Sequence, residues 1–126
     1  MNFRDLEAKA LMLNELYEHP EAKKYGRAWT TQELMLGFVG DVGDLAKLVQ
    51  ADAGVRSIDD HRAKIGHELS DCLWSILVLA RKLAIDLEAE FVRNVEAISD
   101  NVARQIDCSS VAPSDSLNRT DQSLRD

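Results

Sequence analysis

The sequence predicts an all-α protein built from four helices. Apolar residues recur at intervals of three and four in four separate segments, which is the period of an amphipathic helix. Helix-capping and turn residues stand between these segments. No segment shows the strict alternation of apolar and polar residues that marks a half-buried strand. The expected architecture is therefore helix packed on helix.

The composition is that of a globular chain with an acidic balance. The 126 residues are 45% hydrophobic and 29% charged, and this length fits one domain with a modest core. A formal net charge of -7 argues against nucleic acid polymers and anionic membranes as partners, because both attract basic proteins. A small anionic ligand stays compatible with this charge, since a bound divalent cation reverses the local sign.

The cysteines and apolar runs bear on the compartment. Cys72 and Cys108 have neither zinc-site spacing nor the density of a disulfide framework, so we expect two reduced thiols. The first ten residues are charged and lack the apolar core of a signal peptide. The longest apolar run, residues 72–80, is too short to span a bilayer. We therefore expect a soluble cytoplasmic protein with no membrane partner.

The first helix is expected over residues 3–18. Its apolar stripe consists of residues three or four apart, namely Phe3, Leu6, Ala10, Leu13 and Tyr17. Pro20 and Gly26 then bracket a polar connection, since proline interrupts helical hydrogen bonding and glycine favours turns. Lys24 and Arg27 fall in or beside this connection. They form either part of a solvated loop or a basic site for an anion.

The second helix begins after Thr30. Thr30 can cap the helix while Glu33, three residues later, returns the bond in a capping box. The helix should run to about Ala51 and end near Gly54. Three glycines recur within it, and each costs about 1 kcal/mol relative to alanine. We expect the backbone of another helix to approach closely at these positions, which are Gly37, Gly40 and Gly43.

The third and fourth helices follow two further start signals. Ser57, followed by two aspartates, predicts a cap for a helix over 59–83. A tight break at 84–86 then leads to a helix over 87–105, with Asp86 as its cap. The remaining tail is poor in bulky apolar residues and is expected to be disordered. The domain assignment is thus 1–107 for a single all-α domain and 108–126 for the tail.

Two pairs of acidic residues lie in the most apolar parts of the second and third helices. Asp41 and Asp44 are three residues apart, as are Glu68 and Asp71, so each pair presents two carboxylates on one helix face. A solvated or salt-bridged face is the plainer explanation. The apolar surroundings favour a functional site, because two such pairs can converge between helices as carboxylate metal sites do.

The ligand set favours a hard cation. Four carboxylates suit magnesium or manganese better than the softer transition metals. Di-iron bundles usually supply Glu-x-x-His motifs, but His67 directly precedes Glu68 and so points elsewhere around the helix. A neighbouring or surface role is therefore expected for His67.

These residues resemble a known enzyme family. D-x-x-D in LMLGFVGDVGDLAKLVQ and E-x-x-D in HELSDCLWSILVLARKLAIDLEAEF are similar to the two motif helices of the MazG-like, all-α nucleoside triphosphate pyrophosphohydrolases. The resemblance covers roughly residues 24–98. It combines both motifs, their order and the apolar helix that follows the second motif. The fold it implies is a four-helix MazG-like bundle assembled as a dimer or tetramer.

The resemblance implies a reaction and a metal. Asp41, Asp44, Glu68 and Asp71 would bind Mg²⁺, with Mn²⁺ as a possible substitute. Water would attack the α-phosphorus of a nucleoside triphosphate, releasing a nucleoside monophosphate and pyrophosphate in nucleotide house-cleaning. Asp41 is the expected general base. The family commonly has glutamate in place of both aspartates, and often another acid in place of Gly40.

Substrate contacts are expected from basic and aromatic residues. Phosphate-facing cations should come from Lys47, one turn after Asp44, or from Lys24 and Arg27. The resemblance implies that Asn94 corresponds to an asparagine on the family's last helix, although the basic residues that usually follow are absent. Two tryptophans could stack on a nucleobase or belong to the core, and these are Trp29 and Trp74.

Two other functions stay open from sequence alone. The chain could be a catalytically weakened MazG-like module that binds a nucleotide or metal, which the two aspartates would favour. It could also be a helical oligomerisation domain whose acids only aid solubility. A homodimer or homotetramer is expected, since the helix over 59–83 is apolar around more than one stripe.

Overall fold

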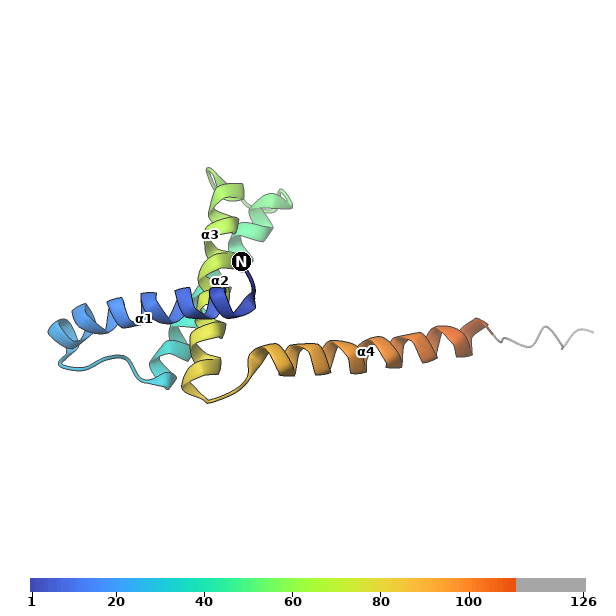
Figure 1. Cartoon of the computed structure of the whole chain (residues 1–126). Helices are drawn as coiled ribbons and strands as arrows, with labels where there is room; N and C mark the ends of the chain where they lie inside the picture. The colour runs from blue at the N-terminus through green and yellow to red at the C-terminus, as the bar shows by residue number, and fades with distance from the viewer. Residues whose placement is uncertain (111–126) are drawn as a thin grey trace, which may run out of the picture. The chain divides into compact units, whose positions relative to one another are not determined.

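The predicted all-α class is confirmed for the part of the chain that is described. A computed structural model describes residues 1–110, which form four helices and contain no strand. These are α1 (Phe3–Tyr25), α2 (Thr31–Asp52), α3 (His61–Lys82) and α4 (Leu87–Ser110) (Figure 1). No helix among these residues has the length and apolar character needed to cross a membrane.

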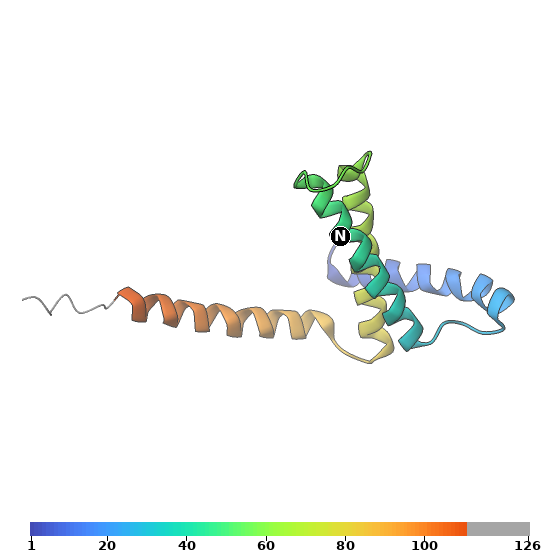
Figure 2. The same cartoon turned by 180° about the vertical axis from the view of Figure 1, so that it is seen from behind.

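The chain divides into two compact units. The first, Met1–Glu88, contains α1, α2, α3 and the beginning of α4. In this unit α2 and α3 lie side by side, and α1 runs across the pair, as both views show (Figures 1 and 2). The second unit begins at Ala89, and its described part is the rest of α4.

The core of the first unit lies where α1 crosses α3. Val78 is fully buried, and Leu77, Ala10 and Leu34 are nearly so. Partly buried side chains pack around them, contributed by α1, α3, α4 and the connection before α2: Phe3, Trp29, Trp74, Leu79 and Leu87. This apolar cluster fixes α3 against α1 and the start of α2, and thereby positions the acidic residues of α2 and α3.

The first helix is longer than predicted, because it continues through Pro20. Proline removes one helical hydrogen bond, yet α1 ends only at Tyr25, where Gly26 adopts a left-handed conformation with φ 78°. Pro20 and its neighbour His19 are exposed, so water can hydrate the carbonyl that proline leaves unbonded. Lys24 therefore lies in the last turn of α1 and not in a loop.

The start of α2 confirms half of the predicted capping box. Thr30 Oγ1 accepts a hydrogen bond from the Glu33 backbone N–H at 3.2 Å. The Glu33 carboxylate does not return the bond, because it pairs with Arg27 at 2.6 Å. The helix ends at Asp52, and Gly54 follows with φ 79°, as the sequence indicated.

The explanation offered for the α2 glycines is wrong for the described chain. A Cβ at Gly37 would meet the ring of Trp29 at 3.5 Å, which is an ordinary side-chain contact. A Cβ at Gly40 or Gly43 would meet nothing within 4 Å among the described residues. No helix backbone of the described chain approaches at these positions.

The ends of α3 and α4 also differ from prediction. Ser57 does not cap α3: the helix begins at His61, and its N-cap is Asp60, which has φ 59° and makes no side-chain capping bond. Aspartate tolerates this left-handed conformation better than most residues. The fourth helix continues to Ser110, so residues 108–110, expected in the tail, are helical. The rest of the predicted tail, 111–126, lies outside the described residues.

Candidate metal centre

The pairing of α2 with α3 brings three of the four predicted ligands together. One carboxylate oxygen from each of Asp41, Asp44 and Glu68 lies within 4.8 Å of the others. Asp41 and Asp44 share a face of α2 because they are one helical turn apart, and Glu68 faces them from α3. Asp41 and Glu68 are half-buried, whereas Asp44 is exposed. We call these three residues the acidic cluster.

The acidic cluster is electrostatically unfavourable without a positive partner. Burial is the main cause that raises the pKa of Asp41, and Asp71 and Asp44 raise it further. Burial likewise raises the pKa of Glu68, with added contributions from Asp41, Asp71 and Asp44. Both shifts reflect carboxylates that have lost water and gained negative neighbours. A cation at this position would favour the ionised form of every member.

One carboxylate oxygen of Glu68 is in an unfavourable environment. Its Oε2 atom is buried and has no hydrogen-bond partner among the described residues. Leaving a buried polar atom unsatisfied costs about 1–3 kcal/mol, and more for a charged group. Most buried polar atoms in folded proteins have a hydrogen-bond partner, so an atom without one calls for an explanation. A bound cation would supply the missing partner.

Asp71, the fourth predicted ligand, is engaged differently. Its Oδ2 atom lies 3.2 Å from Nε2 of His67, four residues earlier on α3. Asp71 is not a member of the acidic cluster, although it is close enough to raise the pKa of Asp41 and Glu68. His67 was given no partner by the sequence. Because residues four apart share a helix face, the spacing alone could have suggested this contact.

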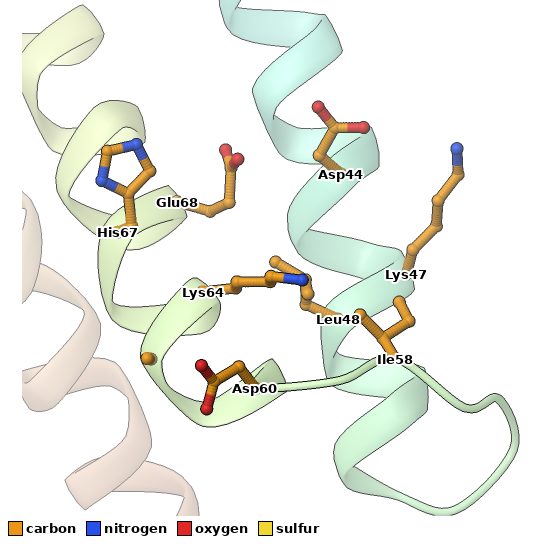
Figure 3. Close-up of a pocket in the computed structure, with 9 residues that line it drawn as sticks. Asp44, Lys47, Leu48, Ile58, Asp60, Lys64, His67 and Glu68 are labelled. Carbon is orange, nitrogen blue, oxygen red and sulfur yellow. The ribbon is translucent and has the colours of Figure 1, made fainter.

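A cavity of about 430 Å³ adjoins the acidic cluster at the end where α2 and α3 are connected (Figure 3). Asp44 and Glu68 line one end of the cavity, and Asp60 is at the other. Lys47 and Lys64 line it from α2 and α3, respectively, as the close-up shows. The other lining residues are Leu48, Ile58, Ala63 and His67.

The cavity lining includes one predicted residue and one that was not predicted. Lys47, which was expected to face a phosphate, lines the cavity one turn after Asp44, and its contact with a phosphate stays a prediction. Lys64 was missed by sequence analysis. It stands four residues before Glu68 and therefore shares a helix face with it, a signal that the sequence contains.

The predicted basic contacts at the start of α2 have partners of their own. Lys24 Nζ lies 5.1 Å from the ring centroid of Tyr25, within range of a cation–π interaction. Arg27 pairs with Glu33, and this hydrogen bond raises the pKa of Arg27 and lowers that of Glu33. Neither Lys24 nor Arg27 lines the cavity.

The two tryptophans belong to the apolar packing of the first unit. The Trp74 Nε1–H donates to the Ala10 carbonyl at 3.0 Å, and its ring meets that of Tyr17 edge to face at 5.7 Å. Trp29 packs against the core, beside Gly37. Neither ring lines the cavity. The base-stacking roles stay predictions, whereas the core alternative accounts for both side chains.

Two further residues, Asn94 and Cys72, lie outside the acidic cluster. Asn94 lies on the part of α4 that belongs to the second unit, with an exposed side chain. Cys72 follows Asp71 and is buried, and its pKa is raised first by burial and then by Asp41, Glu68 and Asp71. The three side chains whose donor atoms come together are all carboxylates, namely those of the acidic cluster.

Searches of known protein families, curated proteins and solved structures find no match to this chain.

Proposed function

We propose that the chain is a magnesium-dependent nucleoside triphosphate pyrophosphohydrolase, which cleaves a (d)NTP into a (d)NMP and pyrophosphate. The observation that carries the proposal is the buried Oε2 of Glu68, which has no hydrogen-bond partner among the described residues and lies within a cluster of three carboxylates. The motif resemblance described above gives the reaction class. The cavity with two lysines beside the cluster gives room and charge for phosphates.

The residues present fit a hard divalent cation. The donor set consists of carboxylate oxygens, which magnesium and manganese prefer. Asp41, Asp44 and Glu68 would hold the ion, and Asp71 would join them on release from His67. When bound, magnesium would neutralise phosphate charge and orient the triphosphate.

Two of the chain's own groups would then act on the water and the phosphates. Asp41, whose pKa is raised, would accept a proton from the attacking water at a carboxylate oxygen. The water oxygen would form a bond to the α-phosphorus while the bond from that phosphorus to the bridging oxygen breaks, so the electron pair leaves with pyrophosphate. Lys47 would donate hydrogen bonds to the phosphates.

A weakened, non-catalytic module is the second candidate. It is favoured by the pairing of Asp71 with His67, which leaves three carboxylates in the cluster where the family motif has four acids. Such a module would bind magnesium without releasing pyrophosphate.

We also propose that the chain assembles as a homodimer or homotetramer. Support comes from apolar side chains on the outer surface of α3, where Leu69 and Leu73 are 52% and 45% exposed. Gly40 and Gly43 likewise present open backbone on α2, with no neighbour in the described chain. A partner subunit could cover both surfaces.

The test is a substrate screen with two readouts. The protein is incubated with the eight common nucleoside triphosphates and either Mg²⁺ or Mn²⁺, and pyrophosphate and orthophosphate are measured separately. We expect pyrophosphate from at least one substrate, and a loss of at least about a hundredfold in Glu68→Gln. Glu15→Gln, which changes an exposed glutamate on α1, is the matched control.

Three outcomes would count against the enzyme. Orthophosphate in place of pyrophosphate would mean that the wrong bond was assigned. Magnesium binding by calorimetry without turnover would favour the non-catalytic module. Absence of magnesium binding would leave a helical oligomerisation domain as the better description.

A further inference from the structure

The cavity beside the acidic cluster is lined by Lys64 as well as by Lys47, and the reaction proposed above gives Lys64 no task. Lys64 projects from the first turns of α3 into the space between α2 and α3 (Figure 3). Lys47 lines the cavity from α2. Among the described residues, neither ammonium group has an ion pair, although three acidic residues line the same cavity.

The lining chemistry favours phosphate over a nucleobase. In the part of the chain that the structure describes, the cavity is lined by lysine, carboxylate, imidazole and aliphatic groups, and by no tryptophan, tyrosine, phenylalanine, asparagine or glutamine. Stacking on a base needs an aromatic or guanidinium plane, and reading its edge is typically done by amides. Two lysines, one from each helix, instead suit an anion with several oxygens.

The volume is also suited to part of a nucleotide. About 430 Å³ lies near the lower end of the range for small-molecule pockets, roughly 300–1,000 Å³. The carboxylates at one end would repel a phosphate unless a divalent cation stands between them. Anion binding in this cavity should therefore require the metal.

Resting on the proposed function, we propose that this cavity is the subsite for the pyrophosphate leaving group, held by Lys64 and Lys47. Asp44 and Glu68 would help to hold the divalent cation, which would neutralise the charge of the pyrophosphate. The α-phosphorus then lies next to Asp41, and the β- and γ-phosphates extend toward the connection between α2 and α3. The nucleobase lies outside the cavity. The subsite therefore selects for the length of the phosphate chain, and Lys64 is a substrate-binding residue.

The experiment is calorimetry on the full chain with inorganic pyrophosphate as the probe, in the presence and absence of saturating Mg²⁺. Wild type should bind pyrophosphate only with Mg²⁺, and more tightly than orthophosphate. Lys64→Met should weaken this binding about tenfold or more, and Lys64→Arg should keep most of it. Lys9→Met, which removes the same charge from an exposed site on α1, is the control and should stay within about twofold.

Circular dichroism should show that each variant is folded, since Lys64 is exposed and its replacement removes no core contact. Equal affinity for pyrophosphate in Lys64→Met and wild type would overturn the proposal, as would binding that does not need Mg²⁺ or no binding at all. Lysine-dependent binding of pyrophosphate without turnover of any triphosphate would refute the hydrolase and leave the subsite standing. Turnover of a triphosphate that is unchanged in Lys64→Met would refute the subsite and leave the hydrolase standing.

Discussion

The two halves of α3 differ in whether their partly buried polar groups are hydrogen-bonded. Toward its C-terminal end, Trp74 donates its Nε1–H to Ala10, and the neighbouring Leu77 and Val78 are buried against α1. Toward its N-terminal end, Glu68 has a buried oxygen that finds no hydrogen-bond partner within residues 1–110, and it faces two aspartates of α2.

The two regions of α3 therefore contribute differently: the region that α1 crosses stabilises the fold, and the region of the acidic cluster is suited to binding. Where α1 crosses α3, the hydrogen-bonding needs of the Trp74 indole are met and apolar burial supplies the stabilisation. At the acidic cluster, burial and like charges raise the pKa of two carboxyl groups, which lowers the stability of the ligand-free fold. Changes in the first region should thus affect folding, and changes in the second should affect binding.

The largest effect on stability is expected from Leu77→Ala. Leu77 is 4% exposed, and truncating a buried leucine costs about 2–5 kcal/mol through lost burial and the cavity that remains. Urea denaturation should show this loss, while magnesium affinity under native conditions stays within about twofold. A large loss of magnesium affinity in protein that is still folded would contradict the separation of the two regions.

A smaller loss is expected from Trp74→Phe. This change keeps an aromatic ring but removes the donor to the Ala10 carbonyl, which should destabilise the fold by about 1–2 kcal/mol. The KM for a triphosphate substrate should not change, because the ring packs against Tyr17 and does not line the cavity. A raised KM with unchanged stability would instead restore Trp74 as a base contact.

A gain is expected from Gly43→Ala. An added Cβ would meet nothing within 4 Å, so the variant should gain about 1 kcal/mol of helix propensity. Gly40→Ala is the matched variant, since its Cβ position is equally open. Thermal unfolding and light scattering should be measured together. Destabilisation, or dissociation of an oligomer, would show that a partner subunit's backbone packs here.

The smallest effect concerns pH. The pKa values of Asp41 and Glu68 are raised in the folded chain above their ordinary values of about 4. The folded state therefore retains these protons to higher pH than the unfolded state does. Their contribution to stability is fully present below about pH 4 and is lost as pH rises through the folded-state pKa values.

Glu68→Gln should weaken this pH dependence. Urea unfolding from about pH 4 to pH 8, without metal, should show a smaller fall in the free energy of unfolding for this variant than for wild type. At neutral pH, Mg²⁺ should stabilise wild type more than the variant, because the ion binds the folded state. Identical pH profiles for the two proteins would refute the electrostatic account of the cluster.

Local sequence determined much of this protein by itself. The helical period of the apolar residues fixed the class, and the oxygen of Thr30 caps α2 as its side-chain chemistry predicts. The three-residue spacing placed Asp41 and Asp44 on one face of α2 because helix geometry is local.

Tertiary structure decided what each side chain meets. By its spacing, Asp71 could lie beside either Glu68 or His67 on α3. Only the structure shows that it pairs with His67. The sequence around Trp74 would look the same whether its ring stacked on a ligand or packed on α1. Only the crossing of α1 over α3 shows that it contacts Ala10 and Tyr17. Periodicity defines the faces of a helix, whereas contacts between residues distant in sequence define which face is covered and by what.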